Sequence, residues 1–308
     1  MGQVKYSVVV PVYRGELTLR KLAKELIFFF NSERFSFELI FVDDFAPDKS
    51  WDIIKSIKKD HEEVIRGIRL SGNSGQHNAL KCGILNATGE YIITMDEDLQ
   101  HSPYDIIKLI MKQKESDYDL VYGSFRKLSH NKFRNLTSRV LKKLLRVGLP
   151  GLHPDYSPFR LIKSKVAREA LSGKTSYGFI DAYLSLSRSK TASVEVIHSK
   201  RYAGRSSYNL RKLISHSINI FINFSVPLIR VLAWSFLILI LLLAISGTLV
   251  VLQNVYHKIF ASGQHSIYNI CMILFLLIIF ITVVIYLASM VWSILRNKKN
   301  SFSINEII

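Results

Sequence analysis

Two acidic clusters follow directly on apolar segments of this sequence. Asp96-Glu97-Asp98 comes after the run at 91–95, and Asp43-Asp44 comes after the run at 38–42. Two carboxylates separated by one residue on a loop can hold a hard divalent cation, Mg²⁺ or Mn²⁺, that also bridges phosphate oxygens. In the transfer of a sugar from a nucleotide donor, such a cation stabilises the charge that develops on the diphosphate leaving group.

Each cluster also has an ordinary interpretation. Asp96-Glu97-Asp98 could be a solvated acidic turn, and Asp43-Asp44 could be the charged start of a helix near Trp51. The position of both clusters at the ends of apolar strands favours ligand binding, because ligands of parallel sheets bind at the carboxyl ends of the strands. We therefore expect Asp96 and Asp98 to hold the metal, and Asp43 and Asp44 to bind the base and ribose of a nucleotide.

The elements that must position these residues alternate between strand and helix patterns. The apolar runs predict strands at 6–12, 38–42, 64–70, 91–95 and 119–123, and the intervening patterns predict helices at 18–30, 51–59 and 76–86. This alternation predicts an α/β head with a mostly parallel sheet. Parallel pairing would bring both acidic clusters to one edge.

The later part of the chain is much more apolar. Residues 231–252 and 267–295 carry no charged side chain, and each run is long enough to cross a hydrocarbon core. Basic residues flank the two runs on their outer sides, whereas the connecting segment has Lys258 alone. We therefore predict two transmembrane helices with both termini in the cytosol.

Two further segments have the pattern of amphipathic interface helices. Apolar residues recur at helical spacing in 133–147 and in 208–224, and the first segment has a basic opposite face. A helix packed on the core with a solvated basic face is the alternative for 133–147. The predicted organisation is a head at 1–206, an interface region at 207–230, a transmembrane hairpin at 231–295 and a cytosolic tail at 296–308.

The amino-acid composition limits the classes of molecule that the chain is expected to bind. The 308 residues carry a formal net charge of +17, which indicates anionic partners, and with membrane spans present these are lipid and phosphate. Nucleic acid would explain the charge but not the spans. Cys82 and Cys271 are the only cysteines, which excludes a disulfide framework and a cysteine metal site. The N-terminus lacks the pattern of a signal peptide, so we expect the head to be cytosolic.

Four motifs match a known family in order and spacing. The stretches SVVVPVY at 7–13, FVDD at 41–44, NSGQHNAL at 73–80 and MDEDLQH at 95–101 resemble glycosyltransferase family 2. The resemblance implies the Rossmann-like GT-A fold, an inverting sugar transfer, and a metal at Asp96 and Asp98. It also implies a nucleotide-sugar site made by Pro11, Tyr13, Glu16, Asp43, Asp44, Asn73, Gln76, Asp96 and Glu97.

The second half resembles one branch of that family, the polyprenyl-phosphate glycosyltransferases. The stretches YGSFR at 122–126, SPFRL at 157–161 and GRSSYNLRKL at 204–213, together with two C-terminal spans, carry this likeness. It implies a polyprenyl phosphate acceptor at the cytosolic face of a lipid bilayer, with a bacterial inner membrane as the expected location. Arginines bind phosphate bidentately, and those expected to hold the acceptor are Arg126, Arg139, Arg160 and Arg205.

One departure keeps a second acceptor open. Some relatives carry a proposed catalytic Asp where this chain has Pro158, and Asp155 and Asp181 are the nearby substitutes. A polyprenyl phosphate is already an anion and needs no base, whereas a sugar hydroxyl does. Asp181 could be that base, or only a helix N-terminal charge. The alternative function is sugar addition to a lipid-linked oligosaccharide in O-antigen or capsule assembly.

A catalytically inactive scaffold that binds anionic lipid is a third hypothesis, and the intact carboxylates argue against it. The sugar, the nucleotide and the oligomeric state are left open, a homo-oligomer included.

Overall fold

A computed structural model describes residues 4–125, 149, 151–172, 179–197 and 302–308, and single residues or short stretches between 235 and 288. The chain divides into two compact units, residues 1–220 with 298–308, and residues 221–297. The expected interface segments and most of the two expected spans lie outside the described residues, as do Arg126, Arg139 and Arg205. Within the part that is described, no helix is both long and apolar enough to cross a bilayer.

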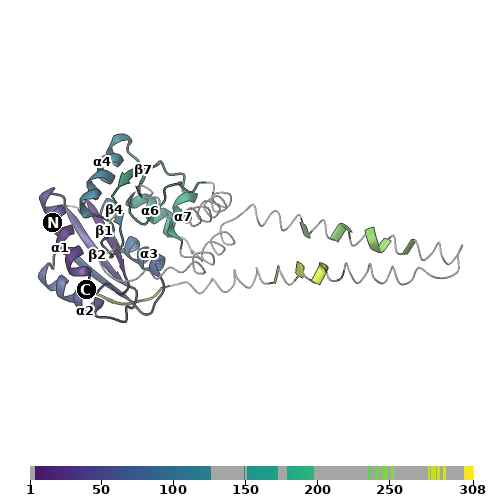
Figure 1. Ribbon diagram of the computed structural model, residues 1–308, viewed down its shortest axis with the longest axis horizontal. Coiled ribbons are helices and arrows are strands. Elements are labelled where there is room, and N and C mark those ends of the chain that lie inside the picture. The colour runs from purple at the N-terminus through teal and green to yellow at the C-terminus, as the bar shows by residue number, and fades with distance from the viewer. Residues whose placement is uncertain are drawn as a thin grey trace. The chain divides into compact units, whose positions relative to one another are not determined.

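The described residues of the first unit form one sheet of eight strands in the order β7-β5-β6-β4-β1-β2-β3-β8 (Figure 1). The strands are β1 (Tyr6–Val12), β2 (Phe37–Asp43), β3 (Ile65–Leu70), β4 (Tyr91–Thr94), β5 (Leu120–Phe125), β6 (Arg160–Lys163), β7 (Thr191–Val196) and β8 (Ile304–Ile307). Strands β1 to β4 run parallel to one another, as do β5 and β7. Strand β6 is antiparallel to β4 and β5, and β8 is antiparallel to β3.

Helices cover both faces of this sheet, which places its central strands away from water (Figure 1). One face carries α1 (Leu19–Ser32), α2 (Ser50–Asp60) and α4 (Ile106–Ser116), the last of these preceded by the 3₁₀ turn η1 (Pro103–Asp105). The other face carries α3 (Gln76–Asn86), α6 (Ser164–Leu171) and α7 (Ile180–Leu186). All seven residues of β1 are buried, and this explains why the strand is apolar throughout except at Ser7.

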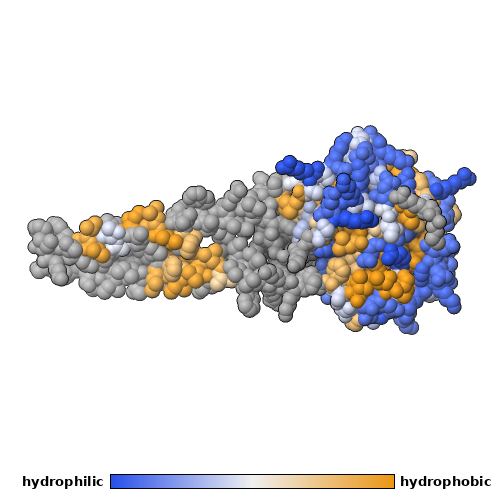
Figure 2. All heavy atoms as spheres, turned by 180° about the vertical axis from the view of Figure 1, so that it is seen from behind, coloured by the Kyte–Doolittle hydropathy of each residue, from blue (hydrophilic) through white to orange (hydrophobic). Residues whose placement is uncertain are grey.

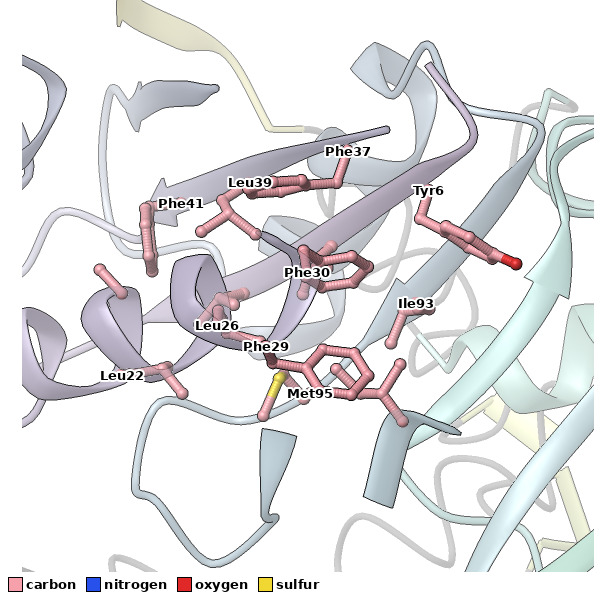
Figure 3. Packing of buried hydrophobic residues seen from close by; sticks show 14 of the residues in the cluster. Tyr6, Leu22, Leu26, Phe29, Phe30, Phe37, Leu39, Phe41, Ile93 and Met95 are labelled. Atoms are coloured by element: carbon pink, nitrogen blue, oxygen red, sulfur yellow. The ribbon is translucent and has the colours of Figure 1, made fainter. Parts of the chain in front are cut away.

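Aromatic side chains dominate the core beneath α1 (Figure 3). The Phe30 ring stacks on Phe37 of β2, with ring centroids 4.8 Å apart, and meets Phe29 edge to face at 5.1 Å. Tyr6 and Ile93 extend the same cluster from β1 and β4. Large aromatic side chains bury much apolar area per residue, so this cluster fixes α1 on the sheet.

The predicted mostly parallel α/β head is confirmed. Strands appear at all five predicted places, and the predicted helix at 76–86 coincides with α3. The apolar patterns do not predict β6, β7, α4, α6 or α7. Residues 304–307, expected within a tail at 296–308, instead form β8 at the edge of the sheet beside β3.

Helix α3 lies unusually close to β1. A Cβ atom added at Gly83 would lie 2.3 Å from Val9 Cγ1 and 3.0 Å from Val42 Cγ2. No side chain fits in that space without displacing the helix. The approach of α3 to the sheet therefore depends on this glycine.

We expect Gly83→Ala to destabilise the protein by about 1–3 kcal/mol, because overpacking outweighs the better helix propensity of alanine. Chemical or thermal unfolding of the full-length protein measures the change. Gly72→Ala is the matched control, since an added Cβ there meets nothing within 4 Å. Equal stability of the two variants would contradict the close-packing argument.

Candidate active site

The acidic clusters lie at the point where the strand order reverses. From β1 the chain proceeds outward through β2 and β3, and then crosses to β4 on the other side of β1. Crevices at such switch points, at the carboxyl ends of the strands, are the usual binding sites of open α/β sheets. Here the Tyr13 backbone N–H, just after β1, donates to Glu97 Oε1 at 3.4 Å and joins the two loops. The structure thus brings the predicted residues of both loops together.

The loops after β1 and β2 hold one another through side chains. The Gly15 N–H donates to Ser50 Oγ at 2.9 Å, and the Glu16 N–H donates to Asp48 Oδ2 at 3.3 Å. In return, the Lys49 N–H donates to Glu16 Oε2 at 3.3 Å. The Glu16 carboxylate, expected at the nucleotide, therefore already stabilises the neighbouring loop.

Asp44 holds the loop that leads into α3. Its two carboxylate oxygens accept the backbone N–H groups of Ser74 and Gly75, at 2.6 and 2.8 Å. Gly75 has φ of +90°, a conformation that favours glycine. From the first residue of α3, Gln76 Nε2 then donates to Asp96 Oδ1 at 2.6 Å. Asp44 and Gln76 thus connect the end of β2 to the acidic turn after β4.

Asp43, the last residue of β2, is fully buried but keeps an unused acceptor. Its Oδ1 accepts the Ala46 N–H at 3.1 Å. Its Oδ2 lies 3.1 Å from Arg69 Nε, yet that oxygen has no hydrogen-bond donor among the described residues. Burial raises the pKa of Asp43 to about 6. A ligand N–H could satisfy this oxygen.

Arg69 is held in place by aromatic rings. Its guanidinium lies over the rings of Phe45 and Trp51, at 5.3 and 5.8 Å from their centroids. The sequence of β3 offers one signal for it, since two arginines, Arg66 and Arg69, stand within a mostly buried strand. Neither its pairing with Asp43 nor the role of Trp51 was predicted.

The turn after β4 concentrates negative charge. Burial, followed by the charges of Asp96 and Asp98, raises the pKa of Glu97 to about 8. In the described part of the chain, no group of three or more His, Cys, Asp and Glu side chains is arranged as a metal site. Mg²⁺ commonly takes only one or two protein carboxylates, with phosphate oxygens and water completing its shell. The Asp96 and Asp98 pair fits a cation that arrives with a diphosphate.

The loops at this edge also carry strained backbone. Arg14, Phe45 and Leu99 have φ values of 64°, 54° and 60°, one in each loop after β1, β2 and β4. Each such conformation costs on the order of 1 kcal/mol for a residue other than glycine, and such residues cluster at functional sites. The strain agrees with a ligand site at this edge.

A buried ion pair near the end of β4 changes what is expected of two residues, Arg160 and Asp181. Arg160 is fully buried; its guanidinium pairs with Asp181, and its Nε donates to Thr94 Oγ1 at 3.1 Å. Tyr122 Oη donates to the same Asp181 oxygen at 3.1 Å. A buried guanidinium requires a counter-charge, so Arg160 does not present itself to an acceptor phosphate and Asp181 is not a free base. Asp181 lies in the first turn of α7, in line with its interpretation as a helix N-terminal charge.

The remaining predicted residues are placed as follows. Pro11 is buried within β1, and Asn73 is exposed in the loop after β3. Asp155, the other candidate base, is exposed and accepts from Ser193 Oγ at 3.0 Å.

Comparison with known proteins gives concordant results. The sequence pattern described as Glycosyl transferase family 2 matches residues 7–171. The undecaprenyl-phosphate 4-deoxy-4-formamido-L-arabinose transferase of Shewanella sediminis is 30% identical over 228 residues, which cover 74% of this chain and 69% of that protein. Its counterpart from Pectobacterium carotovorum is 26% identical over 276 residues, covering 88% and 83%.

Among solved structures, glucosyl-3-phosphoglycerate synthase from Mycobacterium tuberculosis, in complex with phosphoglyceric acid, has a similar fold. The TM-score is 0.50 at 17% identity, over 72% of this chain and 79% of that one. At this identity the likeness concerns the fold alone.

We expect Asp181→Asn to destabilise the protein by about 3–5 kcal/mol, because it leaves the Arg160 guanidinium buried without a counter-charge. Replacing both partners, by Arg160→Met with Asp181→Leu, should cost less. Denaturant unfolding measures both, with the exposed Asp155→Asn as control. A stable Asp181→Asn protein that has lost only acceptor binding would contradict the structural role.

Proposed function

Because the chain belongs to glycosyltransferase family 2, we propose that it transfers a sugar from a nucleotide-sugar to a polyprenyl phosphate such as undecaprenyl phosphate. The chain is a glycosyltransferase. Its donor, its acceptor and its cellular location are the points that we propose. The observation that carries the proposal is the position of Asp43, at the end of β2, and of Asp96 and Asp98, just after β4, at the carboxyl edge of the sheet on either side of β1. The names of the relatives support the acceptor class.

Asp43 would recognise the base of the donor. The imide N–H of uracil and the N1–H of guanine are both donors that could pair with the buried Oδ2 atom, which accepts no hydrogen bond among the described residues. This supports a UDP- or GDP-type donor and does not choose between them. Pro11, Tyr13, Glu16, Asp44 and Asn73 would shape the surrounding loops.

Asp96 and Asp98 would hold Mg²⁺ or Mn²⁺, which when bound supplies positive charge to the diphosphate leaving group. Gln76 orients Asp96 through their 2.6 Å hydrogen bond. The chain's own contribution at this turn is therefore to fix one carboxylate before the donor arrives, which lowers the cost of ordering the site.

The structure supports a phosphate acceptor over a sugar hydroxyl. A phosphate attacks the anomeric carbon as an anion, and attack opposite the leaving group inverts the configuration. A hydroxyl would need a base, but the Asp181 carboxylate is committed to Arg160 and Tyr122, and the Asp155 carboxylate accepts a hydrogen bond from Ser193 Oγ. Arg126, Arg139 and Arg205 remain the candidates to hold the phosphate.

We further propose that the charge-free runs at 231–252 and 267–295 anchor the enzyme in a bilayer, with the head and both termini in the cytosol. The described residues of the second unit are mostly apolar (Figure 2). Several are highly exposed in the isolated chain, such as Leu241 at 59% and Val251 at 61%. Exposed apolar surface of this kind calls for a covering, and lipid would provide it.

Membranes that contain the protein should incorporate label from a radioactive UDP- or GDP-sugar into undecaprenyl phosphate when Mg²⁺ or Mn²⁺ is present. Asp98→Ala should lower the rate by about 10²-fold or more, because it removes charge stabilisation at the leaving group. The control is Asp60→Ala, at an exposed carboxylate that ends α2 and lies outside the acidic turn. The amount of labelled lipid extracted over time gives the transfer rate of the unmodified protein and of both variants.

Two results would count against this account. Label that enters only a pre-glycosylated lipid would replace the proposed acceptor by a lipid-linked oligosaccharide. Full activity of Asp98→Ala would remove the metal assignment.

Donor binding should weaken as the pH falls below about 6. The ionised Asp43 carboxylate accepts the base N–H, and its pKa of about 6 means that the ionised fraction drops tenfold per pH unit below that value. Calorimetric titration with a nucleotide-sugar, whose diphosphate diester does not titrate here, measures the profile. Asp43→Asn should bind weakly and lose this acid limb; an unchanged limb in that variant would contradict the assignment.

A further inference from the structure

The C-terminal residues return to the head and complete its sheet. Strand β8 pairs with β3, with Arg69 opposite Glu306 and Ile68 opposite Ile307. Gly67 and Ile308 exchange two backbone hydrogen bonds, at 3.1 and 2.9 Å. A Cβ atom at Gly67 would lie 2.8 Å from Ile308 Cγ1, so the last residue of the chain packs tightly on β3.

Glu306 of this strand reaches a residue of α2. The Trp51 indole Nε1–H donates to Glu306 Oε2 at 3.1 Å, in a partly buried position. The Trp51 side chain is almost fully buried and otherwise packs in the core beneath α1 and α2. An indole N–H in such a place needs an acceptor, and the C-terminal strand supplies it.

Trp51 connects this strand to the donor site. Its ring lies against the Arg69 guanidinium, which is placed between Trp51 and Phe45. Arg69 Nε in turn lies 3.1 Å from Asp43 Oδ2, the oxygen without a hydrogen-bond donor in the described structure. The contacts therefore run without a break from Glu306 to Asp43.

We propose that β8 is a positioning element of the donor site, in which Glu306 acts through Trp51 and Arg69 to fix the Asp43 carboxylate that receives the nucleotide base. The proposal rests on the proposed function, in that it takes Asp43 as the base-binding residue. Glu306 does not touch the donor. It sets the affinity for the nucleotide and leaves the chemical step and the acceptor untouched.

The test compares Glu306→Ala, Glu306→Gln and Asn305→Ala in the full-length protein. Loss of one hydrogen bond should raise the KM for the nucleotide-sugar and the Kd for UDP or GDP about three- to tenfold, with kcat and the acceptor KM unchanged. Glu306→Gln keeps an acceptor oxygen and should restore nearly normal values. Asn305→Ala is the control, because Asn305 is exposed, lies at the register shift of β8 beside Glu306, and takes no part in the hydrogen bond to Trp51.

Trp51→Phe provides a second route to the same interaction. It removes the donor of the hydrogen bond and should weaken nucleotide binding by a similar factor. Combining it with Glu306→Ala should add little, since both changes remove one interaction.

The outcomes distinguish a failure of the proposed function from a failure of the positioning role of Glu306. If the unmodified protein binds neither UDP nor GDP, the proposed function fails. If it binds a nucleotide and Glu306→Ala binds equally well, only the positioning role fails. The positioning role would also fail if Glu306→Ala lowered kcat and raised the KM values of donor and acceptor together. A Glu306→Gln variant that binds nucleotide no better than Glu306→Ala would overturn it as well.

Discussion

The parallel pairing of β1 with both β2 and β4 is the constraint on which the rest of the structure depends. Val12 lies opposite Asp43, and Val9 lies opposite Thr94, so both neighbours end at the same edge as β1. The strand can occupy this central place because every one of its residues is buried between helices of the two faces. Without this pairing, the carboxylates that follow β2 and β4 would not lie at the same edge of the sheet.

The carboxylates at this edge divide into two groups with different tasks. Asp44, Asp48 and Glu16 accept backbone N–H groups from neighbouring loops, and thereby fix the shape of the crevice. Asp43 and the turn at 96–98 retain acceptor capacity or excess charge that a ligand could satisfy. Burial raises the pKa of Asp43, Asp44 and Glu97, and such shifts are characteristic of sites built for a ligand.

Sequence patterns predict the central strands of the sheet better than its edge strands. The strands β1 to β4 and helix α3 could be predicted because buried parallel strands are rich in apolar residues and α3 fills the interval between β3 and β4 in the alternating pattern. Strand β8 is four exposed residues long, and its partner β3 lies far away in the sequence, so no local signal marks it. Arg160 shows a second limit: its residue type suggests phosphate binding, but only the three-dimensional structure reveals that Asp181 neutralises it in the interior.

The central claim is that the carboxyl edge between β1 and β4 binds a nucleotide-sugar with a divalent cation. The most direct measurement is anomalous diffraction at the manganese edge from crystals of the protein grown with Mn²⁺ and UDP or GDP. The account predicts a manganese peak coordinated by Asp96 or Asp98 and the diphosphate, with the base hydrogen-bonded to Asp43. A nucleotide bound elsewhere, or manganese coordinated away from the turn at 96–98, would contradict it.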